Sequence, residues 1–140
     1  MTARQFLRAI VGLASALLCG ASFAAANILI LNGNAPGEGF NDPTPVAPVG
    51  GNPGMTLGQQ RLNVFQYAAS QWASRLNSNT TISVYAIFAP IACQFNAGYL
   101  GISGPVSAYA NFPNAPYQNT WYNAALANKL AGVDLDGNTF

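Results

Sequence analysis

Residues 56–76, TLGQQRLNVFQYAASQWASRL, restrict the possible folds most, because this stretch combines length with clear helical periodicity. Its apolar side chains recur at spacings of three and four residues, which places them on one side of an α-helix. They are Leu62, Phe65, Ala69, Trp72 and Leu76. Thr56 can cap the first turn, and Gln59 can reach back as in a capping box. We therefore expect a helix that buries this side, with Trp72 in the core.

Two apolar runs on either side of this helix predict β-strands. Residues 26–31 form the first run, which ends at Asn32-Gly33. Residues 80–88 form the second, and their alternation places Ile82, Val84, Ala86 and Phe88 on one face. A helix followed directly by a strand commonly packs across that strand's sheet. The face that begins at Ile82 is thus the expected partner of the helix.

A second, shorter helix is expected over residues 121–130. Asn119-Thr120 can cap its start, and Gly132 can end it. Its expected buried side chains are Trp121, Leu126 and Leu130. Residues 99–101 and 105–109 are candidates for short strands. The predicted fold class is α+β, with a long amphipathic helix packed on a small, incomplete β-sheet and followed by the shorter helix.

Residues 32–55 are too rich in Gly and Pro to form a regular element of useful length. A structureless segment of this length is usually functional or disordered. Phe40 and Val46 are its candidates for attachment to the core. Asp42, which precedes Pro43, is a plausible turn start because its carboxylate can bond to the backbone ahead.

Residues 1–25 have the pattern of a secretory signal peptide. Arg4 and Arg8 precede an apolar run at residues 10–18, and small residues follow near Ala24. An uncleaved N-terminal anchor is the alternative, although the run is shorter than the roughly 20 residues that span a membrane. We expect the mature chain, residues 26–140, to be secreted or periplasmic, with only transient membrane contact.

The composition of the chain favours an exported, neutral surface. Only 6% of the residues are charged, against about a quarter in ordinary soluble domains. Without a basic patch, nucleic acid is not an expected partner. Cys93 is the single cysteine left after cleavage. It is either a free buried thiol or half of a disulfide.

The sequence shows no catalytic group. It contains no His, which removes Ser-His and Cys-His catalysis and most zinc sites from these 140 residues. Ser103 lies in GISG, which lacks the spacing of a nucleophile elbow. Cys93 has no nearby basic residue in sequence to lower its pKa. We therefore assign no catalytic, cofactor-binding or metal-binding residue.

Two pairs of carboxylates are candidates for a site. Glu38 and Asp42 lie in the Gly/Pro-rich segment, and no pattern places them beside the second pair, Asp134 and Asp136. Asp134, Asp136 and Asn138 alternate as in the start of a calcium loop, but the later ligands of that loop are missing. A solvated turn is the expected structure. Aromatic side chains could line a sugar or peptide site: Trp72, Tyr117, Trp121 and Tyr122.

Three phrases together resemble the N-terminal part of secreted bacterial zinc metallopeptidase-like proteins, which often carry an inserted protease-associated domain. They are GFNDPTPVAPVGGNPGMTLGQQRLNVFQYAASQWASRL, ISVYAIFAPIAC and NTWYNAALANKLAGVDLD. The resemblance covers residues 27–136, and its most specific parts are residues 40–44 and 58–62. In that family a zinc-binding H-E-x-x-H helix lies well downstream.

The resemblance implies that residues 26–140 are the front of a zincin-like domain, apparently truncated before its active site. Zinc would then be expected only with the downstream part, and Cys93 would find its disulfide partner there. Whether the chain counts as an enzyme is left open, because the family consists of hydrolases but no catalytic motif is present. Only the full-length protein would bind a peptide or protein substrate.

Two hypotheses of function follow. In the first, the chain is the N-terminal scaffold of an exported metallopeptidase-like protein. In the second, it is a complete small secreted module for binding or surface adhesion, with Asn-, Gly- and aromatic-rich surface contacting polysaccharide or protein. The first predicts a large uncovered apolar surface, and the second does not.

Overall fold

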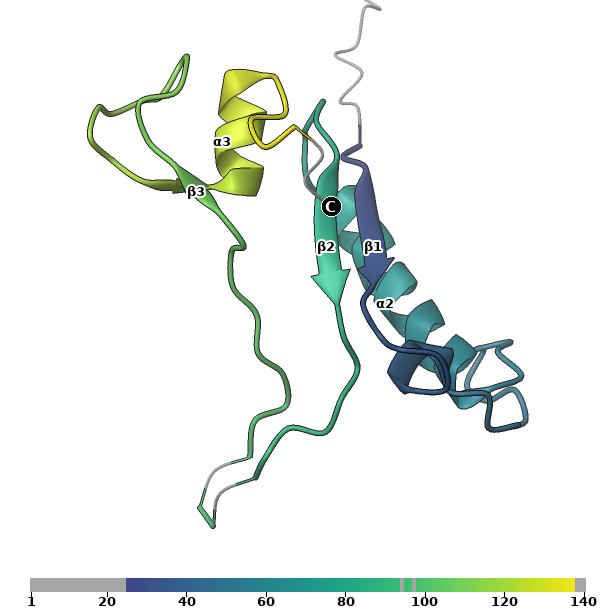
Figure 1. Cartoon of the computed structure of the whole chain (residues 1–140). Coiled ribbons are helices and arrows are strands. Elements are labelled where there is room, and N and C mark those ends of the chain that lie inside the picture. The colour runs from purple at the N-terminus through teal and green to yellow at the C-terminus, as the bar shows by residue number, and fades with distance from the viewer. Residues whose placement is uncertain (1–24, 94, 97, 138–140) are drawn as a thin grey trace, which may run out of the picture.

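The computed structural model describes residues 25–93, 95–96 and 98–137 of the chain (Figure 1). The predicted signal peptide lies outside these residues except for Ala25. The fold is mixed α+β, as predicted, with two α-helices and two small sheets among the described residues. The elements in chain order are β1 (Ile28–Asn32), the 3-10 turn η1 (Gly39–Asn41), α2 (Leu57–Ala73), β2 (Ile82–Ala86), β3 (Ala108–Tyr109), β4 (Tyr122–Asn123) and α3 (Ala124–Ala131).

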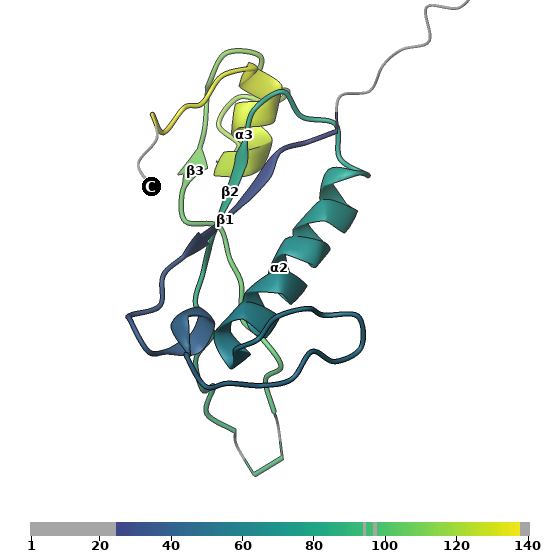
Figure 2. The ribbon, with the colours of Figure 1, turned by 90° about the vertical axis from the view of Figure 1, so that its right-hand side faces the viewer.

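Strands β1 and β2 form a parallel pair, joined by a connection that passes through η1 and α2. Their register pairs Ile28 with Ile82 and Asn32 with Ala86. The helix lies along one side of this pair (Figure 2). Parallel strands need a long crossover of this kind, usually a helix. The two predicted strands thus exist, and each is shorter than its apolar run.

The start of α2 confirms the predicted Thr56 cap, but the side chain of Gln59 bonds to a different residue than expected. The Thr56 hydroxyl oxygen accepts a hydrogen bond from the Gln59 amide at 3.2 Å. The Gln59 side-chain oxygen reaches past the cap and accepts from the Met55 amide at 2.8 Å. The helix ends at Ala73, three residues before the predicted end at Leu76.

The buried side of α2 differs from the prediction at its C-terminal half. Phe65 and Ala69 are partly buried, whereas the side chain of Trp72 is 62% exposed. Trp72 is therefore not a core residue in this structure. The helix packs mainly on β1 and η1, and not on β2 as expected. The helix follows β1 to its last turn, where the Ala26 amide, just before this strand, donates to the Ala73 carbonyl at 3.1 Å.

The Gly/Pro-rich segment folds against the first half of α2. Phe40 in η1 is 4% exposed, and its ring meets that of Phe65 edge-on at 4.8 Å between centroids. The expected attachment through Phe40 is thus confirmed. Gly58 is buried where η1 crosses the helix, and a β-carbon there would lie 2.7 Å from the Asp42 amide nitrogen. The close crossing of loop and helix therefore requires glycine at position 58.

A second unit contains β3, β4 and α3. Its two short strands are antiparallel, with Ala108 opposite Asn123. The helix begins three residues later than predicted, because Asn123 caps it by accepting from the Leu126 amide at 3.0 Å. Gly132 ends the helix in the left-handed conformation, at φ 74°, as predicted. Residues 99–101 form no strand.

One aromatic and one aliphatic side chain that were predicted to be buried in this unit are exposed. Trp121 precedes the helix and is 73% exposed, and Leu126 is 42% exposed. Ala127 and Asn128 occupy the buried side instead.

The core of the first unit can be tested with a matched pair of aromatic truncations. We expect Phe40→Ala to lower the free energy of unfolding by about 3–5 kcal/mol, as for a buried Phe. Trp72→Ala should cost less than about 1 kcal/mol, since the side chain is exposed. Urea denaturation of the full chain measures both values. Equal losses in the two variants would contradict the packing described here.

Candidate functional site

The carboxyl ends of β1 and β2 meet at one edge of the sheet, beside a cavity of about 750 Å³. Ligands of open α/β sheets bind in this position, outside the carboxyl ends of parallel strands. The segment after β1 supplies Asn34 and Glu38, α2 supplies Arg61, and the segment after β2 supplies Phe88. This cavity is our candidate functional site.

Asn34 joins the two walls of the cavity by acting as a substitute for strand backbone. Its side-chain oxygen accepts from the Phe88 amide at 3.0 Å, and its side-chain nitrogen donates to the Phe88 carbonyl at 3.1 Å. The same oxygen accepts from the Phe40 amide at 3.1 Å. A primary amide can do this because its oxygen accepts two hydrogen bonds while its nitrogen donates. Asn34 thus extends the pairing of the sheet beyond the last residues of β1 and β2.

Two further asparagines hold Asn34 in place. Asn32 accepts from the Asn34 amide at 2.9 Å and donates to the Asn41 side-chain oxygen at 2.8 Å. The Asn41 side-chain nitrogen donates to the Asn34 carbonyl at 2.7 Å. These amides satisfy one another and the backbone, so the segment between β1 and η1 has a defined shape despite its composition.

Arg61 forms the positively charged wall of the cavity. Its Nη1 atom donates to the Asp42 carboxylate at 3.0 Å and to the Gly39 carbonyl at 2.9 Å. The guanidinium lies 4.6 Å from the centre of the Phe88 ring, a cation–π distance. Arg61 therefore ties α2 to η1 and to the segment after β2.

Asp42 is held in its charged form by its surroundings. Hydrogen bonds from Thr44 are the main cause that lowers the pKa of Asp42 below 3.8, and Arg61 lowers it further. One of these bonds joins the Thr44 amide to the carboxylate at 3.0 Å. This is the turn predicted for Asp42 from the sequence.

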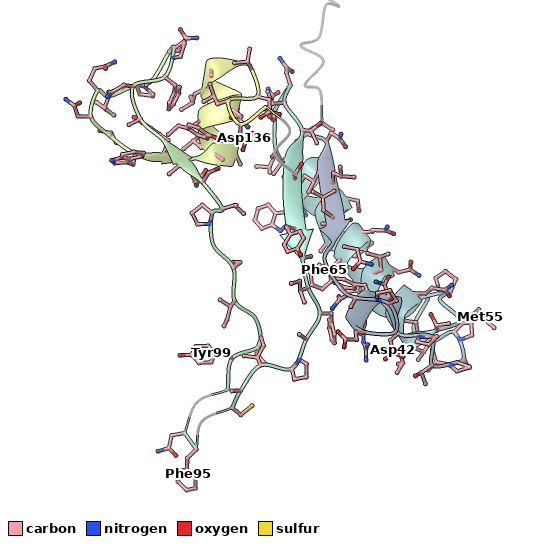
Figure 3. All side chains as sticks on the ribbon, viewed as in Figure 1. Asp42, Met55, Phe65, Phe95, Tyr99 and Asp136 are labelled. Carbon is pink, nitrogen blue, oxygen red and sulfur yellow. The ribbon has the colours of Figure 1, made fainter. Side chains whose placement is uncertain are left out.

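The structure keeps the two carboxylate pairs apart. Asp42 lies beside η1, and Asp136 lies beside α3 at the far end of the molecule (Figure 3). Glu38 lines the cavity near Arg61. No pair of carboxylates across the chain can therefore act on one substrate bond in this arrangement.

Asn128 organises the acidic turn after α3 by hydrogen bonds. Its side-chain nitrogen lies 3.2 Å from Asp134 and 3.4 Å from Asp136, and its oxygen accepts from the Leu135 amide at 3.0 Å. The hydrogen bond with Asp134 raises the pKa of Asp136 above 3.8. The described residues contain no cluster of three metal-ligating side chains, and Asn138 lies outside them.

The remaining sequence candidates lie away from the cavity. Cys93 is exposed in this structure, which contradicts the alternative of a buried thiol; the alternative of a disulfide stays a prediction. Ser103 lies in the exposed segment between β2 and β3. Tyr117 is exposed, while Tyr122 packs edge-on against Phe112 at 5.3 Å.

The site can hold a ligand by hydrogen bonds and charge, and it places no nucleophile or general base beside an acid. Sequence patterns missed Asn34, which follows β1, and Asn128, which lies within α3, because a single asparagine has no spacing signal. Asp42 and Arg61 lie in the two most specific parts of the resemblance, but the resemblance implies no role for either residue.

Comparison of the chain with protein-family models, curated proteins and solved structures finds no match. Within the part of the chain that the structure describes, no helix has the length and apolar character to cross a membrane.

Asn34 can be tested by a substitution that preserves its shape. Asn34→Asp removes the donor to the Phe88 carbonyl, so we expect a loss of about 1–3 kcal/mol in unfolding free energy. Amide exchange at Phe40 and Phe88 should accelerate in the same variant. Asn79→Asp, at an exposed position, is the matched control. A variant as stable as this control would show that Asn34 does not hold the site.

We expect the pKa of Asp42 to lie below 3.8 and the pKa of Asp136 to lie above 3.8. A lowered pKa means that Asp42 adds stability above its unfolded pKa and loses it as the pH falls through the folded value. The raised pKa of Asp136 has the opposite sign: its contribution is present at low pH and is lost as the pH rises. Carbon-13 NMR of the carboxyl groups measures both midpoints. Coincident midpoints would contradict the assigned contacts.

Proposed function

We propose that the chain is the N-terminal scaffold of an exported metallopeptidase-like protein and supplies no catalytic group itself. In this proposal α2 is the long amphipathic helix of a zincin-like domain, and β1 and β2 are part of a larger sheet. Zinc and the peptide substrate belong to the full-length protein. The resemblance described above supports the family, and the uncovered sheet supports the scaffold role.

The observation that carries the proposal is the uncovered face of the β1–β2 pair. Parallel sheets are normally covered on both faces. Here α2 lies along one side (Figure 2), while on the other side Leu29 is 48% and Tyr85 53% exposed. On α2 itself, the side chain of Trp72 is exposed as well. Apolar surface of this kind usually marks contact with further polypeptide.

The cavity at the carboxyl ends of the strands fits a supporting role in this proposal. Asn34 and Arg61 fix the segments that follow both strands, and these segments form the edge at which α/β sheets carry their sites. The scaffold would thus present a defined edge to the substrate cleft.

The proposal is tested on the exported gene product, together with the coding sequence after the codon for Phe140. We expect a continuing frame with an H-E-x-x-H on a helical stretch, one zinc ion per chain, and peptidase activity that a chelator removes. Metal analysis and a peptide-cleavage assay measure the last two. A folded, zinc-free and inactive product that consists of this chain alone would overturn the proposal.

A binding or adhesion module is the second candidate function. Tyr117 and Trp121, between β3 and β4, are more than 70% exposed, and aromatic rings with a polar end suit recognition surfaces. Quenching of Trp121 fluorescence by soluble polysaccharide would favour this candidate.

A further inference from the structure

Arg61 binds the rest of the described chain through one nitrogen of its guanidinium group. Its Nη1 atom donates to the Gly39 carbonyl at 2.9 Å and to the Asp42 carboxylate at 3.0 Å. Nε and Nη2 also carry donors, and neither has a hydrogen-bond partner among the described residues. In the half-buried and buried side chains of this part, no nitrogen or oxygen atom is both buried and unpaired. Nε and Nη2 of Arg61 are therefore accessible from outside the protein.

The contacts of Arg61 hold this free edge in a defined position. Nη1 is tied to η1 through Gly39, and the ring of Phe88 lies 4.6 Å from the central carbon of the guanidinium. The side chain of Arg61 is only 25% exposed. A guanidinium held in this way loses little conformational freedom on binding, and its planar fork matches a carboxylate with two parallel hydrogen bonds.

A second charged side chain, Glu38, lines the same cavity of about 750 Å³. Among the described residues, the ion pair of Arg61 is with Asp42, and the Glu38 carboxylate has no ion-pair or hydrogen-bond partner. Together these three side chains leave the site with a net negative charge, which disfavours a simple anion. A ligand that carries both a carboxylate and an ammonium group complements Arg61 and Glu38 at once.

The remaining lining of the cavity is suited to an apolar side chain. Ile87, Phe88 and Pro90, which follow β2, provide this part of the wall. Cavities of roughly 300–1,000 Å³ that combine apolar walls with a few fixed polar groups are typical of small-molecule sites. The polar groups would orient the charged end of a ligand, and the apolar wall would cover the rest of it.

We infer that this cavity binds a small zwitterion with an apolar side chain, such as an aliphatic α-amino acid. Its carboxylate accepts from Nε and Nη2 of Arg61, and its ammonium group lies beside Glu38. The inference goes beyond the proposed function and does not rest on it, because every residue that carries it belongs to the described part of this chain. Neither zinc nor peptidase activity is needed to test it.

The site is tested by a nuclear magnetic resonance titration of the full chain with L-leucine. We expect a saturable shift of the Arg61 Nε–H signal, with a dissociation constant of about 1 mM or below. Two analogues separate the contacts, since 4-methylpentanoate lacks the ammonium group and 3-methylbutylamine lacks the carboxylate. Each should bind about tenfold more weakly or worse, as expected when a charged hydrogen bond is lost. An unchanged Arg61 signal, or equal binding of L-leucine and 4-methylpentanoate, overturns the inference.

Variants of the two charged residues assign the contacts. Glu38→Gln removes the partner of the ammonium group, so it should weaken L-leucine about tenfold and leave 4-methylpentanoate no weaker. Arg61→Lys keeps the charge but loses the fork, and it should weaken both ligands. Arg75→Lys, outside the cavity, is the matched control and should bind as the unaltered chain does. If Arg61→Lys fails to fold, Glu38→Gln still decides, because unchanged L-leucine binding by that variant contradicts the assigned site.

Discussion

The first turn of α2 is the constraint on which the rest of the first unit depends. A helix begins with four amide groups that lack partners within it. Here the Thr44 carbonyl accepts from Leu57, and the Asp42 carbonyl from Gly58, each at 3.0 Å. The Thr56 side chain accepts from Gln59, and the Thr56 carbonyl accepts the first regular helix bond, from Gln60. The helix start and the Gly/Pro-rich segment therefore form together, and Phe40 is held in the core as a result.

Sequence patterns predicted the features that are set by a few neighbouring residues. The Thr56 cap, the turn at Asp42 and the helix end at Gly132 each depend on one side chain and the backbone within three residues. Attachment by Phe40 was predictable because it is one of few large apolar side chains in a polar segment. The coarse α+β class followed from the alternation of periodic segments.

The features that were missed depend on contacts between distant segments. Periodicity places Trp72 on the same side as Phe65, but burial depends on which distant segments pack there: Phe40 covers Phe65, while Trp72 stays exposed. Similarly, Asn34 and Phe88 are 54 residues apart, and their pairing follows from the parallel register of β1 and β2. No local pattern contains that information. The candidate site was therefore less predictable than the elements around it.

The two edges of β2 differ in a way that follows from the same register. Toward β1, the strand is paired along its length, and Asn34 continues the pairing to Phe88. Toward residues 99–107 the strand meets a groove instead of a partner. An open parallel strand with apolar neighbours is a surface that proteins usually cover. The parallel register thus aligns Asn34 with Phe88 on the side of β1 and leaves the other edge of β2 without a strand among the described residues.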